Sequence, residues 1–75
     1  MIEIGQEFSR DGYSLCVLDI FDYNFKKYAL MSIEREKVEY KFYEIIYINS
    51  TYRLAQVNDT TLEHQLFAVV EGRGL

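Results

Sequence analysis

The sequence contains no proline and no tryptophan, and it has a single cysteine among its 75 residues. That residue, Cys16, cannot form an intrachain disulfide, whereas small secreted domains usually carry several cysteines. The amino terminus has acidic residues where a secretory signal needs positive charge and a long apolar run. No apolar run approaches the roughly 20 residues of a transmembrane helix. These absences predict a cytoplasmic protein that does not enter a membrane.

Flexible linkers are missing as well. No stretch rich in proline, or in glycine and serine, divides the chain, and its four glycines are scattered. A chain of 75 residues is also short for two separate hydrophobic cores. We therefore expect one domain over residues 1–75.

Basic residues are in the minority, because 8 Lys and Arg against 12 Asp and Glu give a net charge of −4. An acidic surface repels nucleic-acid phosphates and anionic lipids, so direct nucleic-acid binding is disfavoured. Stacking of single strands on the aromatic side chains would need a basic groove beside them, and few cations are available for it. A basic protein partner is compatible with this charge.

Residues that carry chemistry are scarce. One cysteine and one histidine, Cys16 and His64, cannot make a structural zinc site, which needs about four such ligands. Cys16 has apolar neighbours and is expected in the core, and His64 is expected on a helix surface. An enzyme would need one of them exposed beside a second ionisable group. The sequence therefore predicts a non-enzymatic protein without catalytic, cofactor or metal residues.

Apolar and aromatic side chains are what the chain has in excess, at 49% hydrophobic and 16% aromatic residues. Aromatic enrichment favours strands. Alternation and turn residues predict strands over residues 2–8, 13–21, 27–33, 38–48 and 52–57. The hairpin over 13–33 is expected at the centre of the sheet, with Asp19 pairing with Lys27 or marking an opening to solvent. The fourth strand is unusually long, so a bend or bulge is expected near Glu44-Ile45-Ile46.

After residue 57 the pattern changes to that of a helix. Thr60 as N-cap and Glu63 three residues later form a capping box, and Gly72 is expected to end the helix as C′. A helix of about three turns is too short to be stable alone, so it must dock on the sheet. The predicted fold class is α+β, with a meandering antiparallel sheet of about five strands and one C-terminal helix packed on it. A small open barrel is the alternative.

Two segments resemble a known family. The first is VLDIFDYN at residues 17–24, followed by KKYAL at 26–30, and the second contains Leu54, Asn58-Asp59 and a short Leu-Glu helix. This pattern resembles the YrzB-like family of small acidic bacterial proteins of unknown function, from roughly Phe8 to Val70. The resemblance implies a cytoplasmic, non-enzymatic small domain, and it brings no catalytic residues.

The tyrosines of the last two predicted strands are the strongest functional signal. Because one helix covers only one face of a sheet, Tyr43, Ile45 and Tyr47 are expected to stay partly exposed on the other face, with Arg53 nearby and Phe25 at a hairpin tip. Exposed aromatic residues often mark interaction surfaces. A second interpretation, in which these rings simply cover that face, stays open.

We therefore predict a small protein-interaction module that binds another protein or a second copy of itself through this aromatic face, without a cofactor. The alternative is a small acidic inhibitor, encoded by a phage or mobile element, that blocks a nucleic-acid-binding enzyme such as a CRISPR nuclease. An acidic surface can occupy a basic channel. In this chain, however, the acids are interspersed with Lys and Arg.

Overall fold

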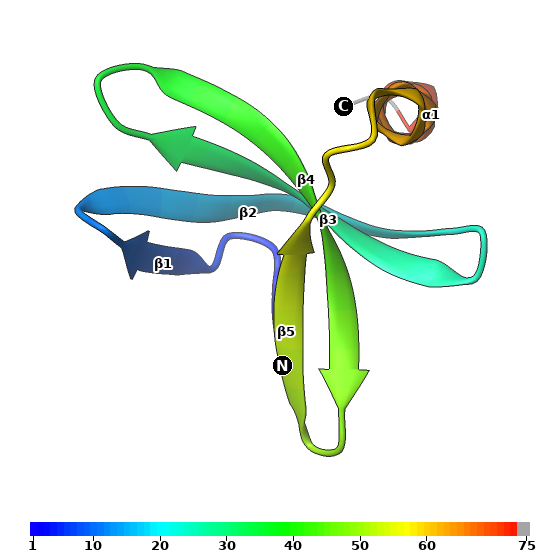
Figure 1. Cartoon of the computed structure of the whole chain (residues 1–75), viewed down its shortest axis with the longest axis horizontal. Coiled ribbons are helices and arrows are strands. Elements are labelled where there is room, and N and C mark those ends of the chain that lie inside the picture. The colour runs from blue at the N-terminus through cyan, green and yellow to red at the C-terminus, as the bar shows by residue number, and fades with distance from the viewer. Residues whose placement is uncertain (74–75) are drawn as a thin grey trace.

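The structure is a computed structural model that describes residues 1–73. Its elements are β1 (Glu7–Arg10), β2 (Tyr13–Tyr23), β3 (Lys26–Glu34), β4 (Val38–Ile48), β5 (Thr51–Gln56) and α1 (Thr60–Gly72). The strands form one antiparallel sheet in chain order. In Figure 1 the strands cross near the centre and their hairpin ends fan outward, while α1 lies to one side. The predicted α+β class, a meandering sheet with a C-terminal helix, is confirmed.

The amino-terminal segment is not the strand predicted over residues 2–8. β1 begins only at Glu7, and Gly5 has a φ of +89°, which glycine adopts without steric cost. The chain turns there, and the Gly5 N–H donates to the carbonyl of Val17 at 2.7 Å. The side chain of Ile2 is nevertheless buried. The alternating pattern thus indicated burial correctly at Ile2, but Ile4 is exposed and this segment is not part of a strand.

The bulge of the sheet lies in β2 rather than in β4. Pairing between β2 and β3 is regular up to Val17 and resumes at Asp19, so Leu18 is an extra residue. The bulge predicted near Glu44-Ile45-Ile46 is wrong, because β4 pairs with both of its neighbours without a register shift. Its length has a different reason, since the first part of β4 pairs with β3 and the last part with β5.

The two faces of the sheet are covered differently. We call the face that carries Met31 the inner face and the face that carries Phe42 the outer face. The inner face curls, so that Phe8 of β1 and Leu54 of β5 pack against the same buried cluster. The members of this cluster are Ile2, Leu15, Val17, Ala29, Met31, Ile33, Tyr43 and Ile45. The edge strands of the sheet therefore cover its inner face.

The outer face is covered by α1. Leu66 and Val70 of the helix are buried in one cluster with Phe21, Tyr28 and Phe42. Burial of each large apolar side chain contributes about 1.5–3 kcal/mol. This packing supplies the stability that a helix of 13 residues lacks by itself.

The amino-terminal end of α1 is capped by a carboxylate. Asp59 is the N-cap, and its Oδ1 accepts hydrogen bonds from the backbone N–H groups of Thr61 at 2.9 Å and Leu62 at 3.2 Å. The predicted capping by Thr60 is therefore wrong by one residue. A carboxylate at this position also interacts favourably with the positive end of the helix dipole.

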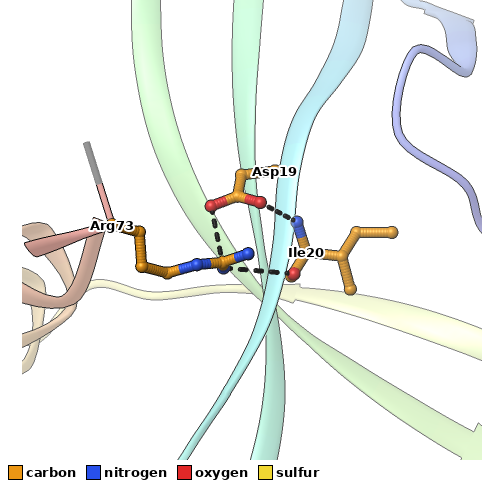
Figure 2. A network of polar contacts seen from close by, with 3 residues as sticks. All are labelled: Asp19, Ile20 and Arg73. Carbon is orange, nitrogen blue, oxygen red and sulfur yellow. Dashed lines mark hydrogen bonds and ion pairs between the residues drawn. The ribbon is translucent and has the colours of Figure 1, made fainter. Parts of the chain in front are cut away.

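The carboxyl-terminal end of α1 is held to β2 by an ion pair, which Figure 2 shows. Gly72 is the last helical residue instead of the predicted C′ residue, and Arg73 is the C-cap. Arg73 Nη1 donates to Asp19 Oδ2 at 3.1 Å and to the Ile20 carbonyl at 3.5 Å. Asp19 Oδ1 accepts from the Ile20 N–H at 2.9 Å. The Asp19 side chain is only 4% exposed, so Arg73 provides the counter-charge that its burial requires.

Replacing Arg73 by methionine leaves the Asp19 carboxylate buried without this counter-charge. We expect the free energy of unfolding, measured by urea denaturation, to fall by about 2 kcal/mol. Asp19→Asn in the same background removes the charge, while the amide oxygen still accepts from Ile20. The double variant should therefore recover most of the lost stability.

The control is the surface pair of Lys27 with Asp22, which stands in place of the predicted pair of Asp19 with Lys27. Its Nζ–Oδ1 distance is also 3.1 Å, but the side chains are 38% and 74% exposed. Lys27→Met should change the free energy of unfolding by less than about 1 kcal/mol. A loss as large as that of Arg73→Met would contradict the special importance of the buried pair.

Candidate interaction groove

The helix covers only part of the outer face. Its 13 residues span about 20 Å, and its buried contacts with the sheet are made through Leu66 and Val70. Toward the β3–β4 hairpin the sheet extends beyond these contacts, and Tyr40 is 61% exposed there. A groove is left between α1 and the outer face.

This groove has a volume of about 550 Å³, within the range of about 300–1,000 Å³ that is typical of ligand pockets. We call it the α1 groove, and its lining residues are Leu18, Leu30, Tyr40, Phe42, Glu63, His64, Phe67 and Val70. Most of them are aliphatic or aromatic. The lining therefore suits an apolar or aromatic group.

The positions of the lining residues follow from the local structure. Leu18 is the bulge residue of β2, and Leu30 and Phe42 are direct partners across β3 and β4. On the helix, Glu63 and Phe67 are four residues apart and so lie on the same side of α1. The groove thus joins a strand bulge, a cross-strand pair and one stripe of the helix.

The chemistry of the α1 groove is that of a binding surface. The rings of Tyr40 and Phe67 are 61% and 54% exposed, so each leaves much apolar area in contact with water. Glu63 is partly buried and His64 is exposed, and both lie at the groove. A bulky apolar side chain could be buried between the rings, and the Glu63 carboxylate could pair with a cation beside it.

Two of the residues predicted to form an exposed aromatic face are buried. Tyr43 is 5% exposed and Ile45 is 4% exposed, and both belong to the inner-face cluster. The prediction of their exposure is wrong because the curled sheet covers its own inner face. The alternative interpretation, that these side chains serve packing, applies to Tyr43 and Ile45.

The other residues of that predicted face do not share one surface. Tyr47 is partly exposed and packs edge-on against Tyr52, with 6.4 Å between the ring centroids. Arg53 is exposed but pairs with Ile46, and it therefore lies on the opposite face of the sheet from Tyr47. The aromatic face predicted from the sequence is not formed.

Phe25, the remaining predicted residue, lies at the tip of the β2–β3 hairpin. Its side chain is fully exposed, at 105%. The φ angles of Asn24 and Phe25 are +52° and +65°, the pattern of a type I′ turn, which favours Asn-Gly. A positive φ costs a residue with a Cβ atom about 1 kcal/mol or more. The ring is therefore held in solvent on a strained backbone.

The groove residues Tyr40 and Phe67 were not predicted as a site. The sequence pattern places Tyr40 on the face that α1 covers, and it places Phe67 at the flank of the apolar helix stripe. The signal that could have identified them is the short helix, which cannot cover the full length of the long strands below it.

The two residues considered for catalysis have different environments. Cys16 is partly buried, with its Sγ 3.9 Å from the carbonyl oxygen of Val17, and His64 is exposed on α1 as predicted. Within residues 1–73, no three His, Cys, Asp or Glu side chains are grouped so that they could hold a metal ion. No helix in this part of the chain is long and apolar enough to cross a membrane.

Comparison with known proteins gives no match to a family model, to a curated protein or to a solved structure. The resemblance to the YrzB-like family accordingly stays a prediction. The α1 groove and the exposed side chains are therefore the features of this chain that bear on its function.

The buried tyrosines predict a loss of stability at alkaline pH. Burial raises the pKa of Tyr43 above its ordinary value of 10.0; Tyr13 raises it further, while Arg10 and Arg35 lower it. Burial, followed by Glu44, also raises the pKa of Tyr28. The folded state thus holds these phenolic protons more tightly than the unfolded state does. Their stability contribution is complete below pH about 10 and is lost as the pH rises through the folded-state values.

The Tyr28→Phe/Tyr43→Phe double variant should therefore lose less stability than the wild type between pH about 9 and 11. Urea denaturation monitored by circular dichroism across this range measures the effect. Tyr40→Phe, at an exposed tyrosine, is the control and should follow the wild type. An alkaline loss that is identical in the double variant and the wild type would contradict the assignment.

The strained turn predicts that Phe25→Gly stabilises the fold. Glycine adopts a positive φ without steric cost, and the exposed ring makes no packing contact that the change would remove. After the entropy cost of glycine in the unfolded state, we expect a gain of about 0.5–1 kcal/mol in the free energy of unfolding. A loss of stability, measured by urea denaturation, would show that the ring packs against the fold.

Proposed function

We propose that this chain is a non-enzymatic protein-interaction module, and that its α1 groove takes up a bulky apolar or aromatic side chain of a protein partner. The observation that carries this proposal is the pair of half-exposed rings, Tyr40 and Phe67, on either side of an apolar hollow. Single exposed apolar residues are common on protein surfaces. Rings that flank a groove are typical of binding sites, where aromatic residues are enriched.

The energetics support an anchor of this kind. Burial of one large apolar side chain contributes about 1.5–3 kcal/mol, which corresponds to about tenfold to a hundredfold in affinity. Much of the binding energy of protein interfaces comes from a few such anchors. One occupant of the α1 groove could therefore dominate the affinity for the partner.

We propose a cytoplasmic location and membership of the YrzB-like family on the sequence pattern alone. The inhibitor of a nucleic-acid-binding enzyme stays the alternative. The distribution of charge does not favour it, because several acids are paired with basic side chains. These acids are Asp19, Asp22, Glu39 and Glu44.

Selection from a random peptide library displayed on phage tests the proposal. Peptides selected on the immobilised protein should carry an aromatic or large aliphatic residue. Their affinity should fall at least about tenfold for Phe67→Ser. Tyr40→Ser, on the opposite wall of the groove, should have a similar effect.

Ile48→Ser is the matched control. Ile48 is 47% exposed, close to the 54% of Phe67, but it lies at the β4–β5 hairpin and not in the α1 groove. The selected peptides should bind this variant as they bind the wild type. Peptides that bind wild type and Phe67→Ser equally well would refute the groove as the binding site.

A further inference from the structure

Phe25 offers the kind of group that the α1 groove suits. Its ring is fully exposed at the end of a hairpin, and its backbone has a positive φ that a bulky residue rarely adopts. Lys26 follows it and is also exposed. A single ring that projects from a tight turn has the shape of an anchor residue.

The two surfaces complement each other in shape and in charge. The groove is concave and apolar, with two half-exposed rings, and it carries the carboxylate of Glu63. The hairpin tip is convex, with the ring of Phe25 beside the ammonium group of Lys26. Within the described part of the chain, Lys26 pairs only with Glu44, in a long surface contact of 3.8 Å, so its charge is available to a second partner.

Resting on the proposed function, we propose that the occupant of the α1 groove is the Phe25 tip of a second copy of this chain. Each copy then carries both the tip and the groove that the contact requires. Each copy would insert its Phe25 ring between Tyr40 and Phe67 of the other, with Lys26 near Glu63.

Phe25 does not occupy the groove of its own chain. Its side chain is fully exposed and so packs against none of residues 1–73. The β2–β3 hairpin meets α1 through Tyr23, whose hydroxyl donates to Gln65 Oε1 at 3.2 Å. Gln65 is not among the groove residues, which come from a different stripe of the helix. A Phe25 ring that fills an α1 groove is therefore that of another molecule.

The arrangement of a tip and a groove on one chain permits a two-fold pair in which each contact is made twice. One inserted ring provides a weak contact, and two together contribute about 3–6 kcal/mol, so the dissociation constant should be no tighter than about 40 µM. The pair should therefore form only at high protein concentration and should dissociate readily.

Sedimentation equilibrium over roughly 10 µM to 1 mM tests the association. The wild-type mass should rise toward that of a dimer across this range. Phe25→Gly, which removes the ring and suits the turn, should remain monomeric, and so should Phe67→Ser. Ile48→Ser should associate as the wild type does. Circular dichroism of each variant verifies that the fold is retained.

Mixing two defective variants tests the geometry directly. Phe25→Gly keeps an intact groove, and Phe67→Ser keeps an intact tip, so one contact can form between them. Isotope-labelled Phe25→Gly should therefore show amide chemical-shift changes at Leu30 and Phe67 when unlabelled Phe67→Ser is added. The Phe25→Gly/Phe67→Ser double variant, which lacks the tip, should produce none.

The outcomes separate this inference from the proposed function. A wild-type protein that stays monomeric throughout, or a dimer that Phe25→Gly does not weaken, overturns the inference. Peptides anchored in the groove would still support the proposed function in either case. If groove-directed peptides are absent and the wild-type protein also stays monomeric, both proposals are wrong.

Discussion

The extra residue Leu18 determines on which face of the sheet every later residue of β2 lies, because side chains along a strand alternate between the two faces. Val17, before the bulge, is buried on the inner face, whereas Asp19 and Phe21, after it, lie on the outer face. In an unbulged strand, Phe21 would point to the inner face and Asp19 would enter the apolar inner cluster. The bulge thus keeps the carboxylate out of that cluster and provides an aromatic residue for α1 to pack on.

The position of α1 follows from this change of face. Packing of Leu66 and Val70 against the outer cluster supplies most of the stabilisation, at about 1.5–3 kcal/mol for each side chain. Such packing is not directional. The Asp19–Arg73 pair is directional, because the buried carboxylate requires a cation beside the bulge and Arg73 at the end of the helix provides it. Together they hold the helix toward one end of the outer face, and the α1 groove is the part that remains uncovered.

Much of this fold could be predicted from alternation and turn residues. The range Val38–Ile48 agrees with β4, and the predicted order of five strands followed by one helix is observed. Curling of the sheet could not be predicted in this way, because alternation shows which residues share a face but not what covers that face. Tyr43 and Ile45 were therefore expected to be exposed, although the edge strands of the curled sheet bury them. The bulge was equally hidden, since the run LCVL at residues 15–18 is apolar on both faces.

The site was predictable only where it depends on local chemistry. Phe25 could be identified as an exposed ring because Tyr23-Asn24-Phe25-Lys26 must turn sharply, and a turn leaves its side chains in solvent. The short helix indicates that part of the outer face stays open, but it does not identify Tyr40 and Phe67, because their exposure depends on where the helix ends above the long strand. Local sequence thus indicates a projecting group, whereas a concave surface arises only when separate elements pack. The hairpin tip holds Phe25 at a positive φ that this residue disfavours, and the groove is left open by the placement of α1. These two features are independent. Their complementarity in shape and charge is what makes association between copies the most specific inference from this structure.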